Sequence, residues 1–231
     1  MRVILILTVV AAIALIVGDR AGVVLAQNEI GRETAAQYNL PRQPGVAVGG
    51  FPFLTQAVDG TYHDVDITVG DWSGKQITVH DLNVKLSDIS APLGDMLQHR
   101  TSNIVARTAT ATALVPYDTV KSFAPAGVES VSSGPDGLHV AGTFPVEGFQ
   151  VPATVVVTVA PSDQGIEVTP VSARAAAGGP TISLAWLRRT LTFAVPLQQL
   201  PLGTRLTAIQ PGPDGLQVTA VAHDVRLFDK Q

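Results

Sequence analysis

The stretch that most constrains the fold of this chain is Val46–Val69, which reads VAVGGFPFLTQAVDGTYHDVDITV. It opens with a joint in which Gly49-Gly50 frees the backbone and Pro52 fixes φ. From Asp64 onward apolar and polar residues alternate, and the apolar set on one face is Val65, Ile67 and Val69. A period of two with β-branched residues is typical of a half-buried strand. This stretch therefore predicts a sharp bend that leads into a sheet with one face in the core.

Bulky apolar side chains gather around that joint, at Phe51, Phe53 and Leu54. One interpretation is a plug in an ordinary core, because most aromatic residues are buried. The other is a wall of a cavity that holds an acyl chain. The sequence leaves both interpretations open.

Tight turns recur through the rest of the chain and predict antiparallel hairpins. Gly134-Pro135-Asp136-Gly137 returns as Gly212-Pro213-Asp214-Gly215, and proline followed by Asp-Gly is a turn sequence. Looser turns are expected at Gly70–Lys75 and Pro161–Gly165. Strands that meet through such turns build a mostly antiparallel sheet.

Two strands change phase along their length. The apolar register slips near His80-Asp81 in the strand Gln76–Leu86, and between Ala220 and Val221 in the strand Leu216–Phe228. Such slips are typical of β-bulges, which bend sheets. We therefore expect an α+β fold, mostly antiparallel β, in which a strongly curved and twisted sheet wraps around an N-terminal helix and encloses an apolar lipid cavity.

The N-terminal helix of that fold is predicted over Ala21–Tyr38, where apolar residues form a moderate stripe. Helical spacing or capping also predicts shorter helices at Ala91–His99, Pro116–Phe123 and within Ile182–Pro201.

The chain begins with Met1-Arg2 and an apolar run, Val3–Gly18, broken only by Thr8. A basic start before such a run is typical of a secretory signal or a short membrane anchor. Small residues at Val24-Leu25-Ala26 would allow cleavage before Gln27, but we favour an uncleaved anchor. The expected division is a signal or anchor segment over 1–18 and a single lipid-binding domain over 19–231, on the extracytoplasmic side of the membrane.

Composition excludes several classes of protein. The formal net charge of −4 argues against nucleic-acid binding, which needs a concentrated basic surface. The chain has no cysteine, so disulfides and thiolate metal sites are excluded. Its hydrophobic content of 46% with 15% charged residues fits an internal lipid cavity as well as a merely alanine- and valine-rich composition.

The sequence lacks a recognisable catalytic centre, so we expect no enzyme activity, no cofactor and no metal. No Gly-x-Ser-x-Gly nucleophile motif occurs. Three His-Asp pairs, which start at His63, His80 and His223, lie in strands, where neighbouring side chains point to opposite faces. Asp64-Val65-Asp66 has the Asp-x-Asp spacing of metal-dependent glycosyltransferases, but it lies in an alternating strand.

Several short motifs resemble one protein family in their order and spacing. The first block is Gly50-Phe51-Pro52-Phe53-Leu54-Thr55 followed by Gly60, and Asp19-Arg20 precedes it. The second block is Leu200-Pro201-Leu202-Gly203, then Asp214-Gly215-Leu216 and Asp224-Val225-Arg226-Leu227. Over about residues 19–228 the chain resembles the actinobacterial lipomannan elongation factor family, long catalogued as a domain of unknown function.

The resemblance implies a non-catalytic cell-envelope protein that binds phospholipids or mannosylated phosphoinositides at the outer face of the plasma membrane. It also implies support for lipomannan elongation, with an envelope mannosyltransferase as a partner. Two alternatives remain open, namely an enzyme of envelope glycolipid metabolism (a glycosyltransferase or hydrolase) and an inert scaffold for a partner protein.

The candidate lipid-binding residues share bulk at the joint, small size on one strand face, or apolar character in a later strand and helix. They are Phe51, Phe53, Leu54, Ala109, Ala111, Ala113, Val155, Val157, Trp186 and Leu187. An indole beside two guanidinium groups also suits a membrane surface, so Arg188 and Arg189 are expected to face lipid headgroups.

Overall fold

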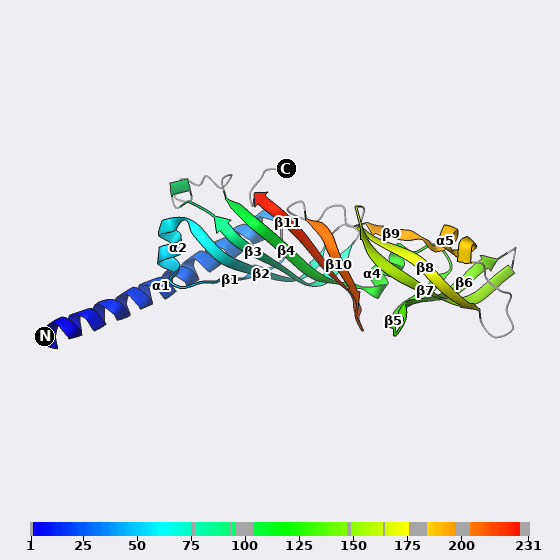
Figure 1. Cartoon of the computed structure of the whole chain (residues 1–231), viewed down its shortest axis with the longest axis horizontal. Coiled ribbons are helices and arrows are strands. Elements are labelled where there is room, and N and C mark those ends of the chain that lie inside the picture. Colours follow the sequence, from blue (N-terminus) through cyan, green and yellow to red (C-terminus); the bar gives the residue numbers. More distant parts are fainter. Residues whose placement is uncertain are drawn as a thin grey trace. The chain divides into compact units, whose positions relative to one another are not determined.

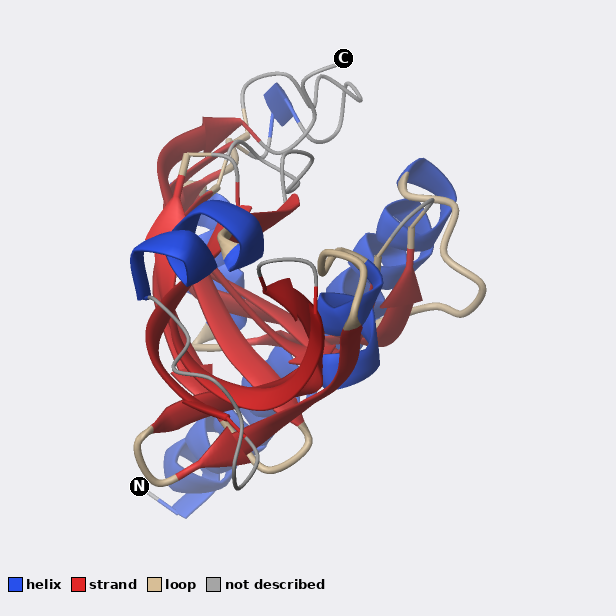
Figure 2. Ribbon diagram, turned by 90° about the vertical axis from the view of Figure 1, so that its right-hand side faces the viewer, coloured by secondary structure: helices blue, strands red, loops and turns tan. Residues whose placement is uncertain are grey.

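The computed structural model describes residues 2–74, 77–92, 94–95, 104–146, 149–163, 165–175, 184–196 and 204–226. The described chain combines a long N-terminal helix with two mostly antiparallel sheets, and one sheet curls into a half-barrel (Figure 2). The predicted α+β class with a curved, mostly antiparallel sheet is therefore confirmed.

The elements are labelled in Figure 1. The described helices are α1 (Arg2–Gln37), α2 (Phe53–Asp59), α4 (Tyr117–Ser122) and α5 (Leu184–Leu191). The six-stranded sheet has the order β1-β2-β3-β4-β11-β10, with bounds Gly45–Val48, Thr61–Ser73, Thr78–Ser90, Val105–Pro116, Gly215–Arg226 and Arg205–Pro211. The five-stranded sheet runs β5-β6-β7-β8-β9, with bounds Val128–Gly134, Gly137–Val146, Phe149–Ser162, Gly165–Ala175 and Phe193–Pro196.

The chain divides into two compact units. Unit 1 comprises Met1–Gly70, Asn83–Thr110 and Ala222–Gln231, and unit 2 comprises Asp71–Leu82 and Ala111–Val221. Strands β2, β3, β4 and β11 contribute residues to both units. The expectation of a single lipid-binding domain over 19–231 stays a prediction.

Unit 2 has a continuous hydrophobic core. Its largest fully buried side chains are Phe144, Leu138, Ile166, Leu191 and Leu216. Helix α4 buries Val120 in this core, and the Tyr117 hydroxyl donates to the Gly212 carbonyl at 2.6 Å. Burial of these apolar residues is the main stabilising term for the unit.

The predicted hairpin turns are largely confirmed. Gly134 pairs with Gly137, Ser162 pairs with Gly165, and the Gly212 N–H donates to the Gly215 carbonyl at 2.8 Å. The turn expected at Gly70 comes later, because β2 continues to Ser73 and brings Trp72 against the core of unit 2.

Three aspartates within strands of the six-stranded sheet lie in the left-handed region, which Asp tolerates better than most residues. In β3 the buried residues Val79 and Leu86 lie in opposite phases, which confirms the predicted phase change, and Asp81 between them has φ 52°. Asp88 in the same strand has φ 51°. The slip predicted between Ala220 and Val221 is wrong. In β11 the buried residues keep one phase as far as Ala222 and change phase at Asp224, which has φ 52°.

Two helix predictions need correction. The anchor and the helix Ala21–Tyr38 form one continuous helix, α1, because no proline interrupts them. The helix within Ile182–Pro201 ends at Leu191, and β9 follows as an edge strand paired with β8. Helical spacing could not reveal this pairing, in which Val195 becomes fully buried. The short helix at α4 is confirmed, whereas most of Ala91–His99 lies outside the described residues.

Gly142 in β6 offers a direct test of the close strand packing in unit 2. A Cβ at this position would collide with the carbonyl oxygen of Gly127. We expect Gly142→Ala to lower the free energy of unfolding by ~1–3 kcal/mol, the usual cost of overpacking. Gly45→Ala in β1 is the matched control, because its Cβ would meet nothing closer than 3.8 Å. Urea unfolding of both variants checks the expectation, and equal stability would contradict the packing described.

Candidate functional site

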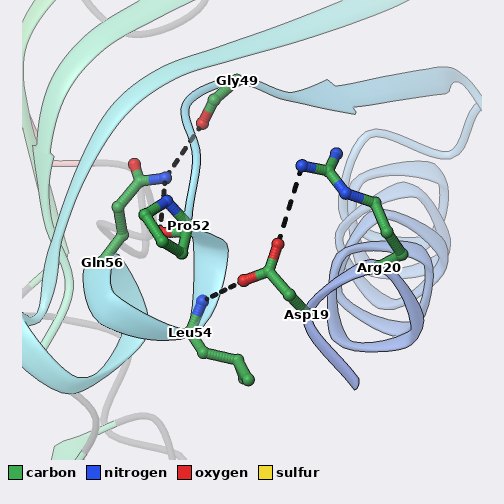
Figure 3. A network of polar contacts seen from close by, with 6 residues as sticks. All are labelled: Asp19, Arg20, Gly49, Pro52, Leu54 and Gln56. Atoms are coloured by element: carbon green, nitrogen blue, oxygen red, sulfur yellow. Dashed lines mark hydrogen bonds and ion pairs between the residues drawn. The ribbon is translucent and has the colours of Figure 1, made fainter. Parts of the chain in front are cut away.

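The first motif block, Gly50–Thr55 with Asp19-Arg20 before it, forms a small polar network where α1 meets α2 (Figure 3). Helix α2 starts after Pro52, which supplies no side-chain cap. The cap comes from α1, because Asp19 Oδ1 accepts a hydrogen bond of 2.8 Å from the Leu54 N–H. This bond satisfies one of the unpaired N–H groups at the start of α2. The bond joins two residues that are 35 positions apart in sequence and thereby fastens α2 to α1.

Asp19 is only 2% exposed, although it follows directly on the apolar run. Its Oδ2 atom has no hydrogen-bond partner among the described residues, and the nearest cation, the Arg20 guanidinium, lies 3.7 Å away. That separation is an ion pair but is too long for a hydrogen bond. The exposed Arg20 guanidinium carbon also lies 5.1 Å from the centre of the Phe51 ring, within range of a cation–π interaction.

Gln56 locks the loop that precedes α2. Its Nε2 atom donates to the carbonyls of Gly49 (3.2 Å) and Pro52 (3.5 Å), and its Oε1 atom accepts from the His63 N–H (3.1 Å). Gly50 has φ 86°, and a Cβ there would lie 2.6 Å from Gln56 Nε2. The backbone conformation and the buried amide thus both require glycine at this position.

Phe53 holds α2 against the rest of unit 1. A Cβ on Gly22 of α1 would lie 3.4 Å from the Phe53 ring, so the glycine allows the two helices to approach closely. On its other side Phe53 contacts Tyr62, with ring centres 5.9 Å apart. Burial raises the pKa of Tyr62 above its ordinary value, so this phenol is neutral at physiological pH. Helix α2 then ends at Gly60, in the left-handed region at φ 67°.

The outer side of this junction is apolar and uncovered. Phe51 is 61% exposed, Leu54 41% and Val58 76%. Leu54 and Val58 are four residues apart and therefore share one side of α2. We call Phe51, Leu54 and Val58 the α2 apolar patch.

Helix α1 carries exposed apolar residues just before the junction. They are Ile6, Leu7, Val9, Val10, Ile13, Leu15, Ile16 and Val17. Among the described residues, one helical span, Ile6–Gln37, is long and apolar enough to cross a membrane. The charged pair Asp19-Arg20 lies immediately after these exposed residues.

The structure separates the two interpretations of the aromatic joint residue by residue. Phe53 is a core residue of unit 1, as the plug interpretation expects. Phe51 and Leu54 are exposed and are not part of that buried core. Their lipid contact stays a prediction.

The other candidate residues for the acyl chain are buried. Ala109 is fully buried in unit 1, while Ala111 and Ala113 belong to unit 2. The hydrophobic core of unit 2 brings Ala113 together with Val155 and Val157. Burial of this kind is expected from a packed core and from an enclosed cavity alike, so their role stays a prediction.

Helix α5 packs on the core of unit 2 through Trp186, which is half-buried. Arg188 and Arg189 are exposed, and Arg188 Nε donates to the Pro170 carbonyl at 3.3 Å. The side chain of Leu187 lies outside the described residues. The membrane role of the two arginines stays a prediction.

The acidic and histidine side chains pair across turns and strands. His80 contacts Asp71 and His139 contacts Asp136, each at 2.6 Å, so the partner of His80 is not the adjacent Asp81. The hydrogen bond with His139 lowers the pKa of the exposed Asp136 below its ordinary value. Asp64 accepts from the Ser87 hydroxyl at 3.1 Å and lies 3.8 Å from Lys85 Nζ. Within the described ranges no group of three His, Cys, Asp or Glu residues could hold a metal ion.

Sequence reasoning missed the contacts of Asp19 and Gln56. The one available signal was a charged pair placed directly after an apolar run. No periodicity links Asp19 to a backbone N–H so distant in sequence, and Gln56 gives no pattern of its own.

Comparison with known proteins gives one finding. The model of a family described as LmeA-like phospholipid-binding matches residues 17–221, which include the α1–α2 junction and most of both sheets. Neither a curated protein nor a solved structure gives a significant match.

The cap supplied by Asp19 can be tested at one amide. Asp19→Ala leaves the Leu54 N–H unpaired, and we expect about 1 kcal/mol less protection of that amide, the usual value of a helix cap. Asp19→Asn keeps an acceptor oxygen and should retain most of the protection. Hydrogen exchange measured by mass spectrometry or NMR reads this out, with the exposed Glu33→Ala in α1 as the control. Equal exchange of Leu54 in the wild type and Asp19→Ala would contradict the cap.

Proposed function

The chain belongs to the LmeA-like phospholipid-binding family, and from this premise we propose that it binds a phospholipid or a mannosylated phosphoinositide at the outer face of the plasma membrane. In this proposal the protein is exported, anchored and non-catalytic. The observation that carries the proposal is the family match over 17–221.

The buried residues of α1 favour an uncleaved anchor. Asp19 and Val23 are both buried within the folded unit. Cleavage before Gln27 would remove both and would leave the Leu54 N–H without its acceptor. Because the apolar helix is also part of the folded unit, we expect the mature protein to keep it. Arg2 would then lie on the cytoplasmic side.

The binding energy is expected to come mainly from acyl chains. Each buried methylene contributes ~0.8 kcal/mol, so a few carbons outweigh one headgroup hydrogen bond of ~1 kcal/mol. The small residues Ala111 and Ala113 on β4 would leave room for a chain beside Val155 and Val157 in unit 2, and Ala109 is a candidate for such a contact within unit 1. Arg188 and Arg189, exposed on α5, would supply cations for anionic headgroups.

The biological role proposed is support of lipomannan elongation, with an envelope mannosyltransferase as the partner. This role rests on the resemblance carried by the two motif blocks. The alternative, a glycolipid enzyme that uses Asp64 and Asp66, has less support, because Asp64 is already engaged by Ser87 and Lys85.

Ala111→Phe tests the acyl-chain site. We expect the purified wild type to carry a diacyl lipid detectable by native mass spectrometry, and Ala111→Phe to lose it, because the ring fills the proposed space. Affinity of the wild type should rise about fourfold per methylene, which corresponds to ~0.8 kcal/mol.

Thr112→Leu is the matched control, since Thr112 lies next to Ala111 on the opposite face of β4. The site would be contradicted if Ala111→Phe retained lipid while its free energy of unfolding fell by ~1–3 kcal/mol, the overpacking cost. The alanine face would then pack on protein, and the lipid would bind elsewhere.

A further inference from the structure

We propose that the α2 apolar patch is a membrane-docking surface. In this inference Phe51, Leu54 and Val58 enter the headgroup layer of the same bilayer that α1 crosses. It rests on the proposed function only in taking α1 as a retained anchor. The partner is the bilayer itself, not the single lipid molecule of the acyl-chain site.

Helix length places the α1–α2 junction at the membrane surface. The apolar run Val3–Gly18 of α1 is 16 residues long and rises roughly 24 Å at 1.5 Å per residue. The hydrocarbon core is about 30 Å thick, and each headgroup layer adds roughly 5–8 Å. A run a few ångström shorter than the hydrocarbon core is accommodated by local thinning of the bilayer. With that thinning, Asp19 and Arg20 lie at the edge of the hydrocarbon and the next turn of α1 lies in the headgroup layer.

Helix α2 is fastened to α1 at that same level. The Leu54 N–H donates to Asp19 at 2.8 Å, and a Cβ on Gly22 would lie 3.5 Å from Leu54 Cδ2. Phe51 lies under the Arg20 guanidinium, 5.1 Å away. Each of these contacts is made to residues 19–22, so the patch lies beside the part of α1 that emerges from the hydrocarbon.

The chemistry of the patch suits an anionic lipid surface. Its three apolar side chains are 41–76% exposed, and moving them out of water is favourable. The carboxylate of Asp19 would otherwise repel lipid phosphates, but it is 2% exposed and bonded to a backbone N–H. The Arg20 guanidinium lies 3.7 Å from Asp19, but its side chain is 58% exposed and can still donate to a lipid phosphate. The surface presented to lipid is therefore apolar with a cation at its edge.

The chain has no cysteine, so single spin labels can be placed cleanly in the full-length protein. We would reconstitute Leu54→Cys and Val58→Cys in nanodiscs of phosphatidylethanolamine and phosphatidylglycerol. Electron paramagnetic resonance then compares collisions with oxygen, which concentrates in lipid, and with an aqueous nickel chelate. Ile13→Cys in α1 reports the hydrocarbon, and Ser132→Cys on the exposed side of β5 reports water.

We expect the labels at Leu54 and Val58 to collide several-fold less with nickel than the label at Ser132, and to lie shallower than the label at Ile13. If Ile13 is in hydrocarbon but Leu54 and Val58 are as accessible to nickel as Ser132, the docking surface is wrong and the anchor stands. If Ile13 itself is in water, the anchor and the docking surface both fail. Lipid retention in native mass spectrometry is measured independently, so it separates either failure from that of the acyl-chain site.

Discussion

The carboxylate of Asp19, buried against the N–H of Leu54, is the contact on which the N-terminal half of the molecule depends. A charged group buried without a partner is costly, so this position requires a donor. The donor comes from a helix that has no cap of its own, because proline precedes it. Helix α2 thus donates the hydrogen bond that the buried Asp19 requires, and α1 supplies the acceptor that the first turn of α2 lacks. The contact also makes the apolar leader part of the folded chain, since α2 would lose its cap without residues 19–23.

The contact between Asp19 and Leu54 explains why the motif around Gly50 has the residues that it has. Gly50 leaves space for the Gln56 amide, Phe53 fills the gap against Gly22, and Gly60 ends the helix in a left-handed turn. Two residues of the same short motif, Phe51 and Leu54, are nevertheless left exposed. The inner side of this segment is closely packed, yet its outer side exposes apolar residues. Exposed apolar patches on a well-packed segment are typical of a contact surface.

Much of the fold follows from local sequence patterns, and the errors have clear physical causes. The Pro-Asp-Gly turns, the strand that starts near Val65 and the helix after Pro116 depend on neighbours in sequence, and they were predictable. The β9 strand depends on pairing with β8, so the helical spacing from Leu191 to Val195 was misleading. The phase change in β11 lies at Asp224, because aspartate tolerates the positive φ there, and apolar periodicity does not report φ. At the candidate site the aromatic cluster was visible, but Asp19 and Gln56 make contacts that no short-range pattern encodes.

A tethered protein faces a different binding problem from a freely diffusing one. With α1 as the proposed anchor, the lipid surface is always present at high effective concentration, so a strongly basic surface is not needed to recruit it. The formal net charge of −4 is then no obstacle, and a single exposed cation such as Arg20 can orient the junction without supplying the affinity. Affinity for an individual lipid can instead come from apolar contacts with its chains, which act only once the lipid leaves the bilayer. In this proposal the anchor and the α2 apolar patch would determine where the protein lies, and the acyl-chain site would determine which lipid it binds.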